Sequence, residues 1–164
     1  MLDRPLHKPR VYLAAPLFND RERSFNASLA AALEDYCEVF LPQRDGLLLA
    51  EMLRDGVPVE VAETRIFERD RSALLACDLL VAVLDGAHID EGVAFEIGFA
   101  HAVGADCIGL QTDVRRALPS GNNPMLTQSL TAVFEDFALL LAYVRDDAQM
   151  PRKSLATDER GDRR

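Results

Sequence analysis

Residues 79–103 constrain the fold most strongly, because they combine an apolar strand, an acidic turn and an apolar helix in one run of the chain. Residues 79–84 form an unbroken apolar stretch between aspartates, a pattern typical of a strand covered on both faces within a parallel sheet. Nearly every residue of 92–103 is apolar, which predicts a helix that is buried nearly all round. The turn, which carries Asp90, is therefore expected at the carboxyl edge of a sheet, where open α/β sheets bind ligands.

The rest of the chain repeats this alternation. Short apolar runs predict four further strands, at residues 11–15, 37–41, 107–111 and 132–134. Apolar residues spaced by three and four predict helices after a cap at Asn19 or Asp20 and at residues 59–77. Two more helices are predicted, a short one from Pro124 with Asn123 as cap, and one at 137–144 with Asp136 as cap. The pattern predicts an α/β fold, a three-layer sandwich around a five-stranded parallel sheet with the flavodoxin-like strand order 2-1-3-4-5.

The length of the chain indicates a single domain, which contains one irregular segment. With 164 residues and 49% hydrophobic content, the chain suffices for one domain with a core. We expect this domain at residues 1–145, followed by a charged tail at 146–164. Residues 43–58 are less regular, with an apolar piece at 47–53 that predicts one or two helical turns. Their length fits either a lid or binding loop, or an inserted surface helix.

Charge and cysteine content argue against several kinds of partner. The 27 acidic residues outnumber the 18 basic ones and give a net charge of −9, which disfavours nucleic acid as a partner. The three cysteines are dispersed, which favours free thiols in a reducing compartment. The N-terminus has no apolar signal region, and no apolar run reaches the ~20 residues of a membrane span. We therefore expect a cytoplasmic protein without a membrane partner.

Two carboxylates are predicted on apolar helix faces. Glu96 lies in the middle of the apolar helix, and Asp70 falls on the apolar side of the helix at 59–77. One interpretation is that both are core carboxylates satisfied by arginine or backbone amides, with Asp90 as a helix N-cap. The other is a catalytic site, because buried carboxylates with shifted pKa values often mark one.

Carboxylate pairs suit reactions at an oxocarbenium-like centre. There, an ionised carboxylate attacks the anomeric carbon and a neutral one protonates the leaving group. A metal site formed by Asp85, Asp90 and Glu91 is the competing functional hypothesis. The sequence has no GxGxxG motif, no P-loop and no His/Cys ligand cluster, so we expect no cofactor and no metal.

Four motifs are similar to those of one known family: VYLAAPLF at 11–18, ERD at 68–70, DEGVAFEIGFA at 90–100 and NPM at 123–125. Over residues 11–144 the chain resembles the nucleoside 2-deoxyribosyltransferase family. The spacing makes the resemblance specific, because Asp70 precedes Asp90 by twenty residues and Glu96 follows Asp90 by six, as in that family. The resemblance implies a five-stranded parallel sheet and a ping-pong exchange of the nucleobase through a covalent deoxyribosyl-glutamate.

The resemblance also implies a role for each matching residue. Glu96 would be the nucleophile, Tyr12 would orient it, and Asp70 would be the acid/base near the nucleobase. The substrate ligands would be Asp90 at the sugar hydroxyls, Phe18 and Gln43 in the base pocket, Asn123 at the 5′-hydroxyl in a neighbouring subunit's pocket, and Met125 over that same pocket. The protein would then be a homo-oligomer built from dimers, up to a hexamer, with active sites shared between subunits.

Three functional hypotheses follow. The first is a nucleoside 2-deoxyribosyltransferase that acts on small-molecule nucleosides and free nucleobases. The second is an N-glycoside hydrolase of nucleosides or nucleoside 5′-monophosphates. Residues 15–18, Ala-Pro-Leu-Phe in place of a Gly-Ser-rich phosphate loop, favour a nucleoside over a nucleotide. The third is a non-catalytic nucleoside-binding domain, against which the retention of all three carboxylates argues.

Overall fold

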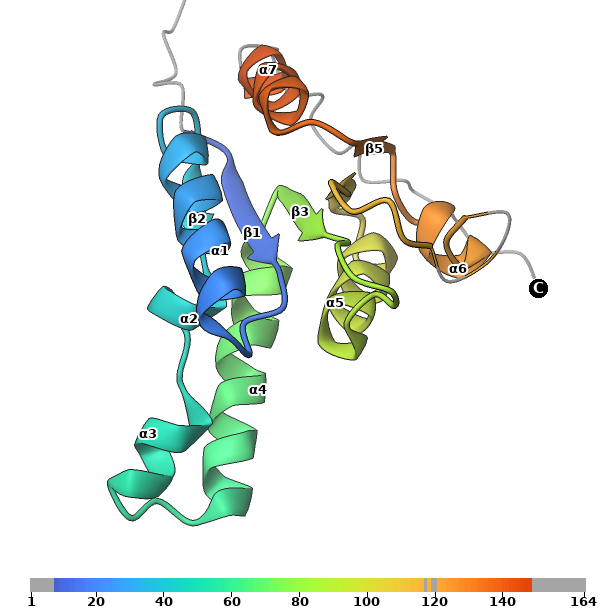
Figure 1. The fold of residues 1–164 in the computed structure, drawn as a ribbon. Helices are drawn as coiled ribbons and strands as arrows, with labels where there is room; N and C mark the ends of the chain where they lie inside the picture. Colours follow the sequence, from blue (N-terminus) through green and yellow to red (C-terminus); the bar gives the residue numbers. More distant parts are fainter. Residues whose placement is uncertain (1–7, 117, 119–120, 149–164) are drawn as a thin grey trace, which may run out of the picture.

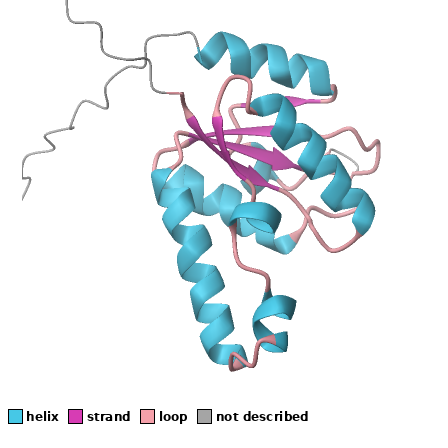
Figure 2. Ribbon diagram, turned by 90° about the vertical axis from the view of Figure 1, so that its left-hand side faces the viewer, coloured by secondary structure: helices cyan, strands magenta, loops and turns pink. Residues whose placement is uncertain are grey.

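Strands and helices alternate along the chain, and helices cover both faces of a central sheet (Figure 1; Figure 2). The structure, a computed structural model, describes residues 8–116, 118 and 121–148. The strands are β1 (Arg10–Ala14), β2 (Glu38–Phe40), β3 (Leu79–Val83), β4 (Asp106–Leu110) and β5 (Ala132–Phe134). The helices are α1 (Asp20–Leu33), α2 (Pro42–Asp45), α3 (Leu49–Arg54), α4 (Val59–Ala76), α5 (Glu91–Ala102), α6 (Pro124–Thr127) and α7 (Phe137–Ala148).

All strand pairs in the sheet are parallel, and the strand order is β2-β1-β3-β4-β5. The predicted fold class and strand order are therefore confirmed. The first four strands differ from their predicted bounds by one residue at one or both ends, whereas β5 has the predicted bounds. The carboxyl ends of β1 and β3 lie side by side, because Ala14 is the register partner of Ala82.

Alternate residues of the strands face opposite layers, as the pleat of a strand requires. Val11 and Leu13 belong to an apolar cluster with residues of α1 and α7. Tyr12 and Ala14 belong to a second cluster, with residues of α4 and α5. The side chain of Tyr12 therefore faces the two helices that carry Asp70 and Glu96.

Side-chain caps fix where several helices begin. Asn19, Asp90, Asn123 and Asp136 each accept hydrogen bonds from backbone N–H groups in the first turn that follows. Pro124 is the first residue of α6, where its missing N–H costs no hydrogen bond. These capping roles are the ones that the sequence predicted.

Helix α5 differs from its prediction, because it is buried on one side only. Val93, Ile97 and Ala100 are buried against the sheet, but Phe95 is 54% exposed and the C-cap residue Val103 is 47% exposed. The prediction of burial nearly all round is therefore wrong for the isolated subunit. The physical reason is that α5 contacts the sheet, α4 and α6, which leaves an apolar side uncovered.

The irregular segment after β2 forms the two short helices α2 and α3. Helix α3 packs beside the amino-terminal half of α4, away from the sheet (Figure 1). The inserted-helix alternative is therefore confirmed for residues 49–54. The piece predicted to be helical, residues 47–53, begins two residues before α3. Its first two residues, Leu47 and Leu48, lie in the connection between α2 and α3.

The two ends of the chain differ in part from expectation. Helix α7 continues to Ala148, beyond its predicted end near residue 144 and into the segment predicted as a tail. The rest of that predicted tail, residues 149–164, lies outside the described residues, as do residues 1–7 of the predicted domain. Cys37, Cys77 and Cys107 are not joined in disulfides, as expected. None of the helices in the described ranges is long and apolar enough to cross a membrane.

Candidate active site

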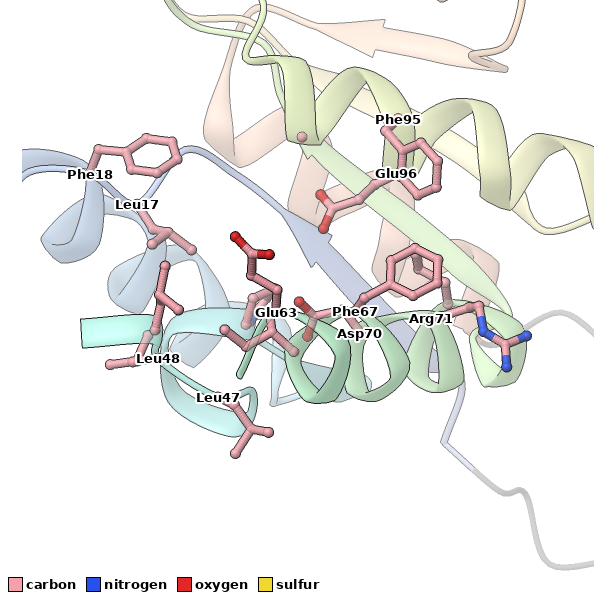
Figure 3. A pocket seen from close by; sticks show the side chains of 15 residues that line it. Leu17, Phe18, Leu47, Leu48, Glu63, Phe67, Asp70, Arg71, Phe95 and Glu96 are labelled. Atoms are coloured by element: carbon pink, nitrogen blue, oxygen red, sulfur yellow. The ribbon is translucent and has the colours of Figure 1, made fainter. Parts of the chain in front are cut away.

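A cavity of about 470 Å³ lies between the loop after β1, the connection before α3, and helices α4 and α5 (Figure 3). Its wall is mostly apolar, with three carboxylates and one arginine among the lining residues. Concave apolar sites with a few converging polar groups are where small molecules bind most often. Figure 3 shows that the three carboxylates, those of Glu63, Asp70 and Glu96, point into the cavity from two different helices.

A hydrogen bond from Tyr12 holds Glu96 in place. The Tyr12 hydroxyl donates to Oε1 of Glu96 at 2.5 Å, so it joins the sheet to α5. Tyr12 has no exposed surface, and its position on β1 directs the ring towards α4 and α5. The hydrogen bond engages Oε1, and Oε2 receives no hydrogen bond from a described residue.

The ring of Tyr12 is itself held by a stack. Phe40, the register partner of Tyr12 on β2, stacks on it with centroids 5.4 Å apart and ring planes 23° apart. The guanidinium of Arg69 lies 5.3 Å from the Phe40 centroid and donates to the backbone carbonyl of Asp45. Stacking and cation–π contacts restrict the orientation of an aromatic ring, so Phe40 and Arg69 position the hydroxyl that binds Glu96. Sequence reasoning missed Phe40, although the predicted pairing of strands one and two gave a signal for it.

Burial is the main cause of unusual acidity at this site. It raises the pKa of Glu96 to about 7, and the negative charges of Asp70 and Asp90 add to the rise. The hydrogen bond from Tyr12 acts in the opposite direction, because it stabilises the ionised carboxylate. Burial and the charge of Glu96 raise the pKa of Tyr12 far above its ordinary value, so Tyr12 stays a donor.

Asp70 faces the same cavity from α4. Burial raises its pKa to about 6, while the charge of Arg69 acts to lower it. Its Oδ1 is buried and has no hydrogen-bond partner among the described residues. The charge of Asp70 also raises the pKa of Glu96, so ionisation of Asp70 disfavours ionisation of Glu96. Such a pair can supply one charged and one neutral carboxyl group.

Two other predicted residues lie at or near the cavity. Phe18 lines it from the loop after β1, although its side chain is 74% exposed. Oδ1 of Asp90 accepts hydrogen bonds from the N–H groups of Gly92 and Val93, so this oxygen serves as the helix cap. The charge of Asp90 nevertheless acts on Glu96, which places the two carboxylates in one electrostatic environment.

The remaining predicted residues are not brought into the cavity of their own subunit. Gln43 is held elsewhere, because its amide donates to the backbone carbonyl of Arg23 and accepts from the side chain of Asn26. Asn123 caps α6, and Met125 is 79% exposed. The cavity wall instead includes apolar residues that were not predicted individually as site residues, namely Leu17, Leu47, Leu48 and Phe95. Of these, Leu47 and Leu48 lie in the segment for which a binding loop was one of the two alternatives.

The acidic turn does not form the alternative metal site. Asp85 accepts hydrogen bonds from the hydroxyl of Thr112 and the N–H of Asp113, while Asp90 caps α5. In the part of the chain that the structure describes, no three His, Cys, Asp or Glu side chains are arranged to hold a metal ion.

Residues 11–152 match the family described as nucleoside 2-deoxyribosyltransferase. A comparison with curated proteins gives no match. Among solved structures, the chain is similar to a 2-deoxyribosyltransferase from Bacillus psychrosaccharolyticus, with a TM-score of 0.68 and 24% identity over 82% of this chain and 95% of that one.

Two further structures share the fold. A 2-deoxyribosyltransferase from Leishmania mexicana has a TM-score of 0.60 and 22% identity, over 84% of this chain and 97% of that one. A CMP N-glycosidase from Clostridium botulinum has a TM-score of 0.53 and 21% identity, over 82% of this chain and 97% of that one. At these identities the likenesses to solved structures show the common fold.

The replacement Tyr12→Phe tests the link between β1 and α5. It removes the hydroxyl and keeps the ring, so the ionised form of Glu96 loses its hydrogen bond and the pKa of Glu96 rises above about 7. Glu96 then loses its proton at a higher pH, which an NMR titration of ¹³C-labelled glutamate carboxyl groups measures. Tyr36→Phe, on the opposite face of the sheet, is the control and should leave the titration unchanged. An unaltered Glu96 pKa in Tyr12→Phe would contradict the assigned interaction.

Proposed function

Because the chain belongs to the nucleoside 2-deoxyribosyltransferase family, we propose that it exchanges the nucleobase of 2′-deoxyribonucleosides through a covalent intermediate on Glu96. One observation carries the proposal: Glu96, oriented by Tyr12, and the protonatable Asp70 face one apolar cavity. A nucleoside needs these two groups, a nucleophile at C1′ and an acid near the base. A domain that only bound nucleosides would gain nothing from a desolvated carboxylate pair.

The first half-reaction makes one bond and breaks one. An oxygen of Glu96 attacks C1′ of the deoxyribose, and the bond between C1′ and the base nitrogen breaks. The electron pair of that bond goes to the base, which takes the proton of Asp70 and leaves. In the second half-reaction a new base attacks C1′, gives a proton to Asp70 and displaces Glu96 as a free carboxylate. The enzyme returns to its starting protonation state.

The first half-reaction needs an ionised Glu96 and a neutral Asp70. In the free protein the pKa of Glu96, about 7, lies above that of Asp70, about 6, so a proton must pass from Glu96 to Asp70 before the first half-reaction. Tyr12 donates to Glu96, so its hydrogen bond favours the form of the pair in which the negative charge lies on Glu96. Burial raises the pKa of Asp70 to about 6, which keeps a proton available to it closer to neutral pH.

The cavity wall supports a nucleoside rather than a nucleotide as substrate. Arg71 is the only cationic side chain among the described lining residues, and it forms an ion pair with Glu68 at 2.8 Å. A 5′-phosphate would bring roughly two negative charges into a cavity that already holds three carboxylates. Apolar residues such as Leu17 and Phe67 suit the faces of a nucleobase.

Hydrolysis is the alternative fate of the same intermediate. Water in place of a base would attack C1′ and release free 2-deoxyribose. We place transfer first because the largely apolar wall disfavours water and offers contact area to an incoming base. Both reactions use the same first half-reaction, so they differ only in the acceptor.

Incubation with deoxyinosine and free adenine, followed by chromatography, tests the proposed exchange. We expect hypoxanthine and deoxyadenosine to appear together. Glu96→Gln should lower both exchange and hydrolysis by at least about a hundredfold, because an amide is a poor nucleophile. The control Glu91→Gln removes an exposed carboxylate from the start of the same helix and should stay active. Hypoxanthine with free 2-deoxyribose alone would identify a hydrolase, and no turnover would contradict both reactions.

We further propose that subunits share their active sites in a homo-oligomer. Asn123 caps the short helix α6 and Met125 lies on it, and neither lines the cavity of its own subunit. At the cavity, Phe67 and Phe95 are about half exposed, with ring centroids 6.4 Å apart. A second copy would bury this apolar surface and could bring its Asn123 to the substrate, as a two-fold contact does twice.

Mixing two inactive variants tests the shared site. Asn123→Ala and Glu96→Ala subunits should each have low activity, but a hybrid dimer has one site in which both groups are intact. Co-refolding the two variants should therefore restore part of the activity, measured as base exchange. Refolding each variant alone is the control. Hybrids that form without any gain, or a fully active monomer in solution, would refute the shared site and leave Asn123 as a helix cap.

A further inference from the structure

A third carboxylate in the cavity has no part in the proposed reaction. Glu63 lies on α4 seven residues before Asp70, and its side chain points into the same cavity (Figure 3). Residues spaced by three, four and seven share a helix face, so Glu63 projects from α4 on the same side as Ile66, Phe67 and Asp70, which also line the cavity.

Among the described residues, none occupies the Glu63 carboxylate. No hydrogen bond or ion pair joins it to another described residue, whereas Glu68 on the same helix pairs with Arg71. Most of the other residues that line the cavity are apolar, and Arg71, the one cationic side chain among the described lining residues, is paired with Glu68. An exposed helical glutamate often faces water alone, but this one faces a ligand cavity. An ionised carboxylate only accepts hydrogen bonds, so Glu63 would recognise a ligand through the N–H or O–H groups of that ligand.

The position of Glu63 on α4 would place it beside the base of a bound nucleoside, at the end far from the sugar. Glu96 and Asp70 mark the glycosidic bond, with the sugar at Glu96 and the base nitrogen at Asp70. Seven helical residues span ~10 Å along α4. A purine that extends from the glycosidic bond along α4 therefore turns its opposite edge towards Glu63. The apolar residues between the two carboxylates, Ile66 and Phe67, would lie beside the purine.

We propose that Glu63 is a specificity-determining residue that accepts hydrogen bonds from the base edge opposite the glycosidic bond, and that it favours guanine. This inference rests on the proposed function for the orientation of the nucleoside. Guanine presents two adjacent donors on that edge, N1–H and the N2 amino group, which match the two oxygens of a carboxylate. Adenine presents a donor at N6 and an acceptor at N1, so one carboxylate oxygen would face a lone pair.

An amide at the same position reverses the match. Gln offers one acceptor and one donor, which complement the N6 donor and N1 acceptor of adenine and conflict with one donor of guanine. Glu63→Gln keeps the size of the side chain and removes one charge. Glu60→Gln makes the same change about one turn earlier on α4, at an exposed residue that does not line the cavity, and is the matched control.

Binding measured without turnover separates this inference from the reaction. In the Glu96→Gln background, we expect the added Glu63→Gln change to lower the ratio of affinities for deoxyguanosine over deoxyadenosine by about tenfold, measured by calorimetry. The Glu60→Gln control should leave that ratio unchanged. In proteins that retain Glu96, the ratio of kcat/KM for the same two nucleosides should move in the same direction.

The outcomes are distinct. A shifted affinity ratio in the Glu96→Gln background, together with no nucleoside cleavage by the proteins that retain Glu96, would uphold the role of Glu63 and overturn the proposed reaction. Cleavage of both nucleosides with a ratio within about twofold of the parent protein would uphold the reaction and overturn the role of Glu63. A shift of the same size in the Glu60→Gln control would also overturn it, because general charge would then explain the effect. Binding of neither nucleoside would overturn both.

Discussion

The hydrogen bond between Tyr12 and Glu96 is the interaction on which the site depends. It crosses from the central sheet to α5, and it exists because strand alternation turns Tyr12 towards the helix layer while Val11 and Leu13 face the opposite layer. A carboxylate at this depth loses hydration, and a buried donor replaces part of it. The same bond fixes one oxygen of Glu96. The sheet thus sets the position of the group that we propose to be the nucleophile.

The side chains around that hydrogen bond are buried near the sheet and become more exposed farther from it. Phe40 on β2 stacks on the tyrosine ring, and Arg69 on α4 lies over Phe40, both outside the cavity wall. Burial raises the pKa values of Glu96 and Asp70 together, and their mutual repulsion disfavours the doubly charged state. Glu63, two helical turns from Asp70, stays exposed and solvated. On α4, the residue proposed for the chemistry, Asp70, therefore lies nearer the sheet than Glu63, the residue proposed to recognise the base.

Local sequence pattern predicted the sheet, because parallel strands covered on both faces leave continuous apolar runs such as residues 79–83. It also singled out Glu96 and Asp70 as carboxylates on apolar helix faces, and both line one cavity in the structure. Pattern could not predict which apolar residues face water, and Phe95 shows this, because an apolar side chain packs equally well against a core or another molecule. Gln43 was assigned through a family resemblance, but Asn26 and Arg23 hold its side chain. Such contacts between elements depend on tertiary packing.

The central claim is that Glu96 carries the deoxyribosyl group between two bases. Rapid acid quenching of the protein with deoxyinosine and no acceptor, followed by peptide mass spectrometry, tests it most directly. We expect a burst of hypoxanthine close to one equivalent per active site, and the mass of one deoxyribosyl group on the peptide that contains Glu96. A deoxyribosyl group on a different residue, or hypoxanthine release at full rate from a protein whose Glu96 is replaced by Gln, would contradict it.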